Sequence, residues 1–170
     1  LSIFSGLPPL VRTGDRFGAV FTLRNGSSKP MKVTATVKLD PAVANGNPLT
    51  VEIPAGGAVP IVTFDQAHGN IRSVGYRMGG IVYSPDVSAV PETAMEAIRG
   101  ADLWIVDALR YRPHPTHAHV DQALDWIAQS GVKRAVLTNL HIDLDYEELS
   151  ARLPANVEVG FDGWSARVPI

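Results

Sequence analysis

The first third of the chain alternates apolar and polar residues with a period of two, which is typical of strands with one buried and one solvated face. The alternation runs through residues 17–24, 31–39 and 49–53. Turn-forming residues 25–30 separate the first two of these segments. Such a meander has an apolar face that nothing within the same segment covers, so this chain must supply a second layer.

From about Val59 the pattern changes to short apolar strands interleaved with helices. We expect strands at 59–64, 71–77, 81–83, 103–106 and 135–138, and a final hairpin of 157–161 with 164–168. Proline, glycine and capping signals predict helices that begin near Pro91, Val120 and Asp145. The sequence therefore predicts an α+β fold.

Composition excludes several classes of function. Fifteen Lys and Arg against 17 Asp and Glu give a net charge of −2, which argues against nucleic-acid binding by bulk charge. No apolar run reaches the roughly 20 residues of a membrane helix, so no membrane contact is expected. The absence of Cys excludes disulfides, thiolate metal ligands and a thiol nucleophile. No signal peptide is visible at the first residues, and the compartment stays open.

Four predicted strands are each followed by a histidine or an aspartate. These residues are His68, Asp86, Asp107 and His141. Sites in sheets flanked by helices lie outside the carboxyl ends of strands, and His with Asp is a ligand set for zinc and similar metals. Each residue alone favours a structural interpretation, since Asp caps turns and buried His is commonly satisfied in a core. Their repetition indicates a common site.

The segment from His114 to His119 contains three histidines just before a predicted helix. Two interpretations remain open at this point. The histidines bind a metal or an anionic substrate near the helix N-terminus, or they form a solvated loop that caps the helix at Thr116 or His117.

Five short motifs occur in one order along the second part of the chain. They are Asp65–Gly69, Tyr83–Ser88, Trp104–Arg110, His114–His117 and Leu137–His141. This series resembles the second half of phosphodiesterase-like hydrolases of the metallo-β-lactamase superfamily, over about residues 58–170. The resemblance implies half of a four-layer αββα sandwich, whose members use two metal ions, usually zinc or manganese, to activate a hydroxide that attacks an ester.

The resemblance also assigns roles to individual residues. It implies that His68 binds one metal, that His141 binds the other and that Asp86 bridges both. His117, or else His114, would face the scissile phosphate as an acid or a clamp. Asp107 and Arg110 would shape the pocket, with Arg110 on the substrate side.

The ligands that the family supplies from a His-x-His-x-Asp-His motif are missing from this chain. Each metal would keep two protein ligands, whereas a catalytic zinc normally has three. We therefore expect a hydrolase-derived domain with a partial metal site and little or no activity alone. The alternatives are a recombined structural or binding domain without catalysis, and an active phosphodiesterase completed by the His114–His119 segment or a partner chain. A cytoplasmic location follows if the hydrolase resemblance governs.

Residues 1–57 carry a second resemblance. The stretches 4–12, 14–17, 22–25 and 49–56 resemble a β-sandwich module of bacterial α2-macroglobulins. Together the two resemblances imply a chimera, with an antiparallel β segment at 1–57 and a mixed α/β half-domain at 58–170. We expect the meander to cover the bare face of the half-domain's sheet, leaving helices on one outer face of a single domain. An uncovered face would favour a homodimer.

Overall fold

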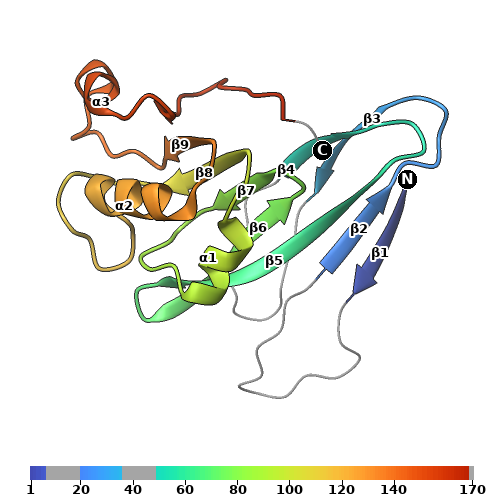
Figure 1. The fold of residues 1–170 in the computed structure, drawn as a ribbon, viewed down its shortest axis with the longest axis horizontal. Coiled ribbons are helices and arrows are strands. Elements are labelled where there is room, and N and C mark those ends of the chain that lie inside the picture. The colour runs from blue at the N-terminus through green and yellow to red at the C-terminus, as the bar shows by residue number, and fades with distance from the viewer. Residues whose placement is uncertain (7–19, 36–48, 169–170) are drawn as a thin grey trace.

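The computed structural model describes residues 1–6, 20–35 and 49–168 (Figure 1). Predictions that fall on 7–19 and 36–48, including part of the α2-macroglobulin stretches and the strand residues up to 39, lie outside the described residues. The strands are β1 (Ser2–Gly6), β2 (Val20–Arg24), β3 (Met31–Ala35), β4 (Leu49–Ile53), β5 (Ala58–His68), β6 (Ile71–Met78), β7 (Ile81–Ser84), β8 (Leu103–Asp107), β9 (Arg134–Thr138) and β10 (Val157–Val159). The helices are α1 (Glu92–Ile98), α2 (Val120–Ser130) and α3 (Tyr146–Arg152).

One eight-stranded sheet organises the molecule, with the strand order β1-β2-β5-β6-β7-β8-β9-β10. Strands β1 to β7 in this order pair antiparallel, and β7 to β10 pair parallel. The 11-residue strand β5 links the two parts, because its first residues pair with β2 and its later residues pair with β6 (Figure 1). A turn at Gly79-Gly80 joins β6 to β7, the strands expected near 71–77 and 81–83.

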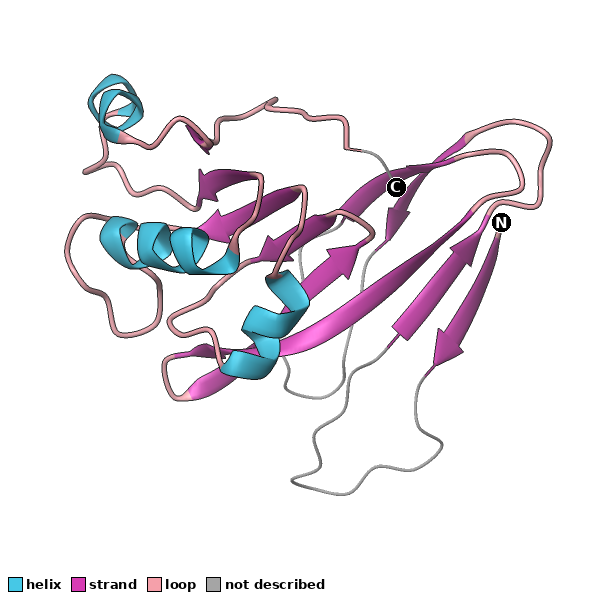
Figure 2. Ribbon diagram, in the orientation of Figure 1, coloured by secondary structure: helices cyan, strands magenta, loops and turns pink. Residues whose placement is uncertain are grey.

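The three helices share one core with one face of this sheet (Figure 2). Alternate residues of the central strands, such as Trp104 and Val106 on β8, point into that core and are fully buried. Helix α2 contributes Ile127 from its apolar stripe, and α3 contributes Leu149. Gly131 ends α2 and adopts a left-handed φ of 66°, which a glycine accommodates without strain.

The opposite face of the sheet has a second core, built with the small sheet β3–β4. Val33, Val51 and Ile53 from that small sheet are buried with residues of β5 and β6, among them Ile61 and Tyr76. Part of the N-terminal segment therefore covers the sheet as expected. Strands β1 and β2 do not cover it, because β2 pairs with the open edge of β5 and extends the sheet sideways.

The end of the chain differs from the predicted hairpin. Val157–Val159 pairs parallel with β9, and residues 164–168 form no strand. Helix α3 carries the chain back across the sheet, so that β10 enters in the same direction as β9 and has no antiparallel partner. The turn predicted at Asp162-Gly163 is present, and the Trp164 amide donates to the Phe161 carbonyl.

The fold class predicted from the sequence is confirmed: the protein is α+β, with one large sheet and helices packed on one of its faces. None of the helices in the described ranges has the length and the apolar character that a membrane crossing requires.

Candidate functional site

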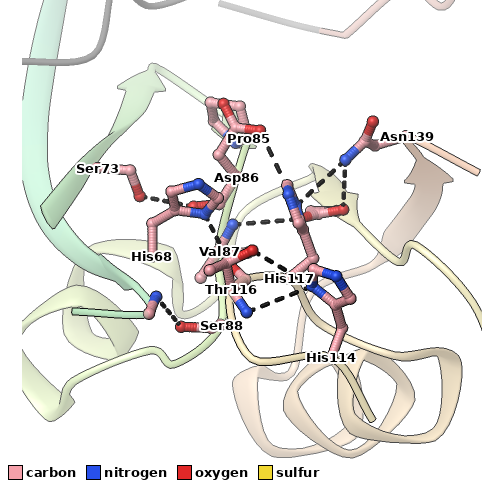
Figure 3. A network of polar contacts seen from close by, with 12 residues as sticks. His68, Ser73, Pro85, Asp86, Val87, Ser88, His114, Thr116, His117 and Asn139 are labelled. Atoms are coloured by element: carbon pink, nitrogen blue, oxygen red, sulfur yellow. Dashed lines mark hydrogen bonds and ion pairs between the residues drawn. The ribbon is translucent and has the colours of Figure 1, made fainter. Parts of the chain in front are cut away.

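The carboxyl ends of three neighbouring parallel strands bring polar residues, the predicted Asp86 and Asp107 among them, to one edge of the sheet (Figure 3). Asp86 follows β7, Asp107 ends β8, and Asn139 follows β9. The registers Ser84↔Val106 and Asp107↔Thr138 align these ends. The β5–β6 hairpin adds His68, and the loop between β8 and α2 adds the remaining histidines.

Asp107 is the buried anion of this site. Its side chain is fully buried and accepts hydrogen bonds from the Val87 amide at 3.1 Å, from Asn139 Nδ2 at 3.1 Å and from His117 Nδ1 at 2.7 Å. Burial raises the pKa of Asp107, although these hydrogen bonds and the nearby imidazole of His117 act in the opposite direction. The carboxylate therefore depends on its three donors to remain charged in the fold.

His117 connects the buried anion to the exposed part of the site. Because Nδ1 faces the Asp107 carboxylate, the proton on Nδ1 is donated to Asp107 and Nε2 is left for other partners. The ring packs edge-on against His68, with 4.7 Å between the ring centroids. Asp86 Oδ1 lies 3.9 Å from His117 Nδ1.

His68 has its tautomer set by the backbone. Its Nδ1 lies 2.7 Å from the Thr116 carbonyl oxygen, which only accepts, so Nδ1 carries the proton. The lone pair of His68 is thereby placed on Nε2. A histidine whose other nitrogen donates to a backbone carbonyl is the usual form of a metal-ligating histidine.

Asp86 and His141 differ in how closely they join this group. The Asp86 side chain is 48% exposed beside His117, on a backbone with a φ of 45°. His141 is exposed after β9, and its Nδ1 lies 3.1 Å from Asp143 Oδ2. The structure thus brings His68, Asp86, Asp107 and His117 together. The His141 side chain pairs with Asp143 instead, although the backbone amide of His141 donates to the Leu109 carbonyl at the same edge.

His114 and Arg110 hold the loop rather than reach the centre of the site. Arg110 donates to the carbonyls of Arg112 and Pro113. His114 Nδ1 accepts from the Thr116 amide at 3.3 Å, and its ring centroid lies 5.3 Å from that of His117. Partial desolvation and then the positive charges of Arg110 and His117 lower the pKa of His114. The predicted cap at Thr116 or His117 is wrong, because His119 is the N-cap of α2.

Asn139 is the site residue that the sequence reasoning missed. It lies inside a motif that was recognised, but no role was assigned to it. Its side chain bonds Asp107, and its own backbone has a φ of 60°. An asparagine directly after an apolar strand, at a position that requires a left-handed turn, is the signal that could have identified it.

Within residues 1–6, 20–35 and 49–168, no three His, Asp or Glu side chains lie close enough together to hold a metal ion. The donor types nevertheless suit one, because an imidazole Nε2 at His68 and an exposed carboxylate at Asp86 are nitrogen and oxygen ligands of the kind that zinc and manganese accept.

Comparison with known proteins finds two relatives that share about a third of their residues with this chain over the matched region. An octanoyltransferase of Porphyromonas gingivalis strain W83 is 33% identical over 102 residues, which are 58% of this chain and 20% of that protein. A solved structure described as a new diphosphatase from the PhnP family is 32% identical, with a TM-score of 0.65, over 66% of this chain and 44% of the other. The chain thus spans less than half the length of either relative.

More distant structures share the fold. The short form of human tRNase Z is 21% identical with a TM-score of 0.50, over 66% of this chain and 44% of the other. The metallo-β-lactamase-fold protein YhfI of Bacillus subtilis is 17% identical with a TM-score of 0.54, over 62% and 48% respectively.

The family model described as beta-lactamase superfamily domain matches residues 14–142, which is more than half of the chain. This match begins inside the segment that was compared with α2-macroglobulins, so the comparisons give no support to that resemblance or to a chimera. The motifs from His68 to His141 all lie within the match. The chain therefore belongs to the β-lactamase superfamily and has the metallo-β-lactamase fold.

Proposed function

We propose that this chain carries one half of a metal-dependent site for hydrolysis of phosphoester or phosphoanhydride bonds. In this proposal His68, Asp86 and His141 are metal ligands, and His117 is the acid that faces the phosphoryl group. The 32% identical relative is named a diphosphatase, which supports phosphoryl chemistry as the reaction class. The chain alone binds metal weakly and turns over little substrate, since three candidate ligands are fewer than two metal ions require.

The observation that carries the proposal is the pair formed by His117 and the buried Asp107, with 2.7 Å between Nδ1 and Oδ2. A carboxylate in this position fixes the imidazole ring and stabilises its protonated form. Nε2 of His117 is then able to donate a proton to the leaving oxygen of an ester. The His117 ring packs edge-on against His68, and its Nδ1 lies 3.9 Å from Asp86 Oδ1, which supports a role for His117 next to both candidate ligands.

A bound zinc or manganese ion would polarise a phosphoryl oxygen and so stabilise charge that develops in the transition state. The residues of the chain then have separate tasks. His68 offers Nε2, because the Thr116 carbonyl holds its Nδ1 proton. Asp86 offers a half-exposed carboxylate. His141 must release Asp143 and turn toward the same point, which is a further reason to expect weak binding.

Titration calorimetry with Mn²⁺ and Zn²⁺ tests the proposed ligands. Asp86→Asn and His141→Ala should each weaken metal binding at least tenfold relative to the wild type. Asp125→Asn is the matched control, because Asp125 is an exposed acidic residue on α2 that takes no part in the site. Equal affinities in the wild type and in both ligand variants would overturn the assignment.

Hydrolysis of bis(p-nitrophenyl) phosphate with added Mn²⁺ separates the remaining alternatives. We expect slow turnover that His117→Ala abolishes. Rapid turnover that is lost in His114→Ala would instead favour a site completed by the His114–His119 segment. A protein that binds neither metal has a structural or binding role, and the proposal fails.

A further inference from the structure

The backbone of Asp86 is held in an unusual conformation. Its φ of 45° is left-handed, and Asp86 and Asn139 are the non-glycine residues with a positive φ in the described part of the chain. Residues with a Cβ adopt this region infrequently, although Asp and Asn do so more readily than most. The contacts around Asp86 should therefore identify what holds it.

Two buried side chains form hydrogen bonds with the peptide groups on either side of the Asp86 Cα. Gln66 Nε2 donates to the Pro85 carbonyl, and Ser73 Oγ donates to the Asp86 carbonyl at 2.8 Å (Figure 3 draws the second bond). The next amide, that of Val87, donates to Asp107. Because φ and ψ of Asp86 are set by the orientations of its two flanking peptide planes, these bonds together fix both angles.

Gln66 and Ser73 act as one unit because of the sheet register. They are directly opposite each other in the β5–β6 ladder, so their side chains leave the same face of the sheet. Both are almost completely buried, at 1% and 2% exposure. The strands that carry them also carry His68, two residues after Gln66, so the same hairpin positions a candidate ligand and the turn that holds Asp86.

The hydrogen bonding of Gln66 is incomplete in a way that indicates a special role. Its Oε1 is buried without a hydrogen-bond partner among the described residues. The reverse orientation of the amide would place Oε1 against the Pro85 carbonyl, two acceptors facing each other. An apolar side chain of similar size would leave no oxygen unsatisfied. The presence of an amide at this position is therefore explained by the hydrogen bond that Nε2 donates to the Pro85 carbonyl. Gly75 leaves the required space, because a Cβ there would lie 2.9 Å from Oε1 and 2.2 Å from the Phe64 ring.

We propose that Gln66 and Ser73 are positioning residues that hold the turn at Asp86 so that its carboxylate points toward His117 and the metal. This inference rests on the proposed function, in which Asp86 is a ligand. It also makes a prediction about the metal-free protein, namely that removing either donor changes the backbone conformation at residue 86.

Ser73→Ala is the main test, and Ser130→Ala is its matched control. Ser130 is also buried, and its Oγ also donates to a backbone carbonyl at 2.8 Å, that of Ile127 at the far end of α2. Both variants should lower the thermal midpoint by a similar amount. Only Ser73→Ala should weaken Mn²⁺ binding, by about tenfold, and Ser73→Thr, which keeps the hydroxyl, should restore most of it. Gln66→Met should behave like Ser73→Ala.

The carbon-13 shifts of the Asp86 backbone in the metal-free protein provide an independent readout. In Ser73→Ala and Gln66→Met they should move toward the values typical of a residue with a negative φ. In Ser130→Ala they should stay unchanged. Unchanged shifts together with unchanged Mn²⁺ affinity in the first two variants would overturn the positioning role. Equal loss of affinity in Ser130→Ala would overturn it as well, since the effect would then be general destabilisation. If the wild type binds no metal, the proposed function fails, and the carbon-13 shifts alone decide whether Gln66 and Ser73 hold the backbone conformation of Asp86.

Discussion

Replacing Ile53 by alanine tests whether residues 1–57 and 58–170 fold as one unit. Ile53 on β4 is fully buried, and the core that contains it joins Val33 and Val51 of the first segment to Ile61 and Tyr76 of the second. If these side chains form one cooperative core, a cavity at position 53 destabilises both segments together. If the segments are independent, the cavity affects the first segment alone.

The size of the effect follows from the burial. Truncating a fully buried isoleucine to alanine costs about 2–5 kcal/mol, because apolar contacts are lost and a cavity remains. For a chain of this length each kcal/mol lowers the thermal midpoint by roughly 2–4 °C, so a drop of about 4–20 °C is expected. Glu52→Ala is the control, since Glu52 points outward from the same strand and should change stability by no more than about 0.5 kcal/mol.

Tryptophan fluorescence is the appropriate probe, because all three tryptophans lie in the second segment. Trp104 is fully buried in the helix-side core, on the opposite face of the sheet from Ile53. We expect the fluorescence transition in urea or heat to shift with the far-ultraviolet circular dichroism transition in Ile53→Ala. A tryptophan transition that stays at the wild-type midpoint, while circular dichroism shows a separate earlier loss of strand signal, would refute the single unit.

Three further predictions concern the site and the sheet edge. Asp107→Asn should stay within about 1.5 kcal/mol of wild-type stability at pH 8, because burial disfavours the carboxylate that the substitution removes. As the pH falls through the raised folded-state pKa of Asp107 toward 3.8, the wild type should become more stable relative to the variant, and urea unfolding at several pH values checks this. Asn139→Ala should be about 1 kcal/mol less stable than Asn139→Gly, since both lose the bond to Asp107 but only alanine is strained at a φ of 60°; equal stabilities would contradict this explanation. Glu158→Gln should cost no more than about 1 kcal/mol at pH 7, and this cost should shrink progressively as the pH falls below 4.5 and through the folded-state pKa. The reason is that the hydrogen bond from Arg134 lowers the pKa of this exposed Glu158, so that its stabilisation is lost on protonation; urea unfolding at several pH values checks this.

Strand and helix types were predictable because each depends on local periodicity. The helix from Val120 was identified by its apolar stripe and by the glycine that ends it, and both features are present. Pairing was less predictable, because it depends on which edges are open in the finished sheet. Periodicity predicted that one face of β2 is buried. It did not predict that β2 would pair with the edge of β5. In the same way, Val157–Val159 looked like a hairpin strand until α3 reversed the direction of the chain before it.

The site was predictable to the extent that strand ends define it. Asp86 and Asp107 follow parallel neighbours, so their convergence needed only the right sheet order. His117 was assigned through a motif resemblance, and its bond to Asp107, ten positions earlier in the chain, depends on how the intervening loop folds back, which periodicity does not describe. The pairing of His141 with Asp143 is a local choice between two nearby partners, and it lies beyond what strand ends predict.

The unfavourable features of the molecule provide an argument for a functional site that is independent of any relative. Both described non-glycine residues with a positive φ, Asp86 and Asn139, contact the same small group of side chains. Asp107 in that group is a buried carboxylate with a raised pKa, and Gln66, which donates to the Pro85 carbonyl next to Asp86, retains a buried acceptor without a partner among the described residues. Backbone strain of this kind costs about 1–3 kcal/mol per residue, and an unsatisfied buried group costs a similar amount. A fold under selection for stability alone would lose such features one by one. Their concentration at one edge of the sheet supports the proposal that the Asp86 carboxylate and the His117 imidazole act there.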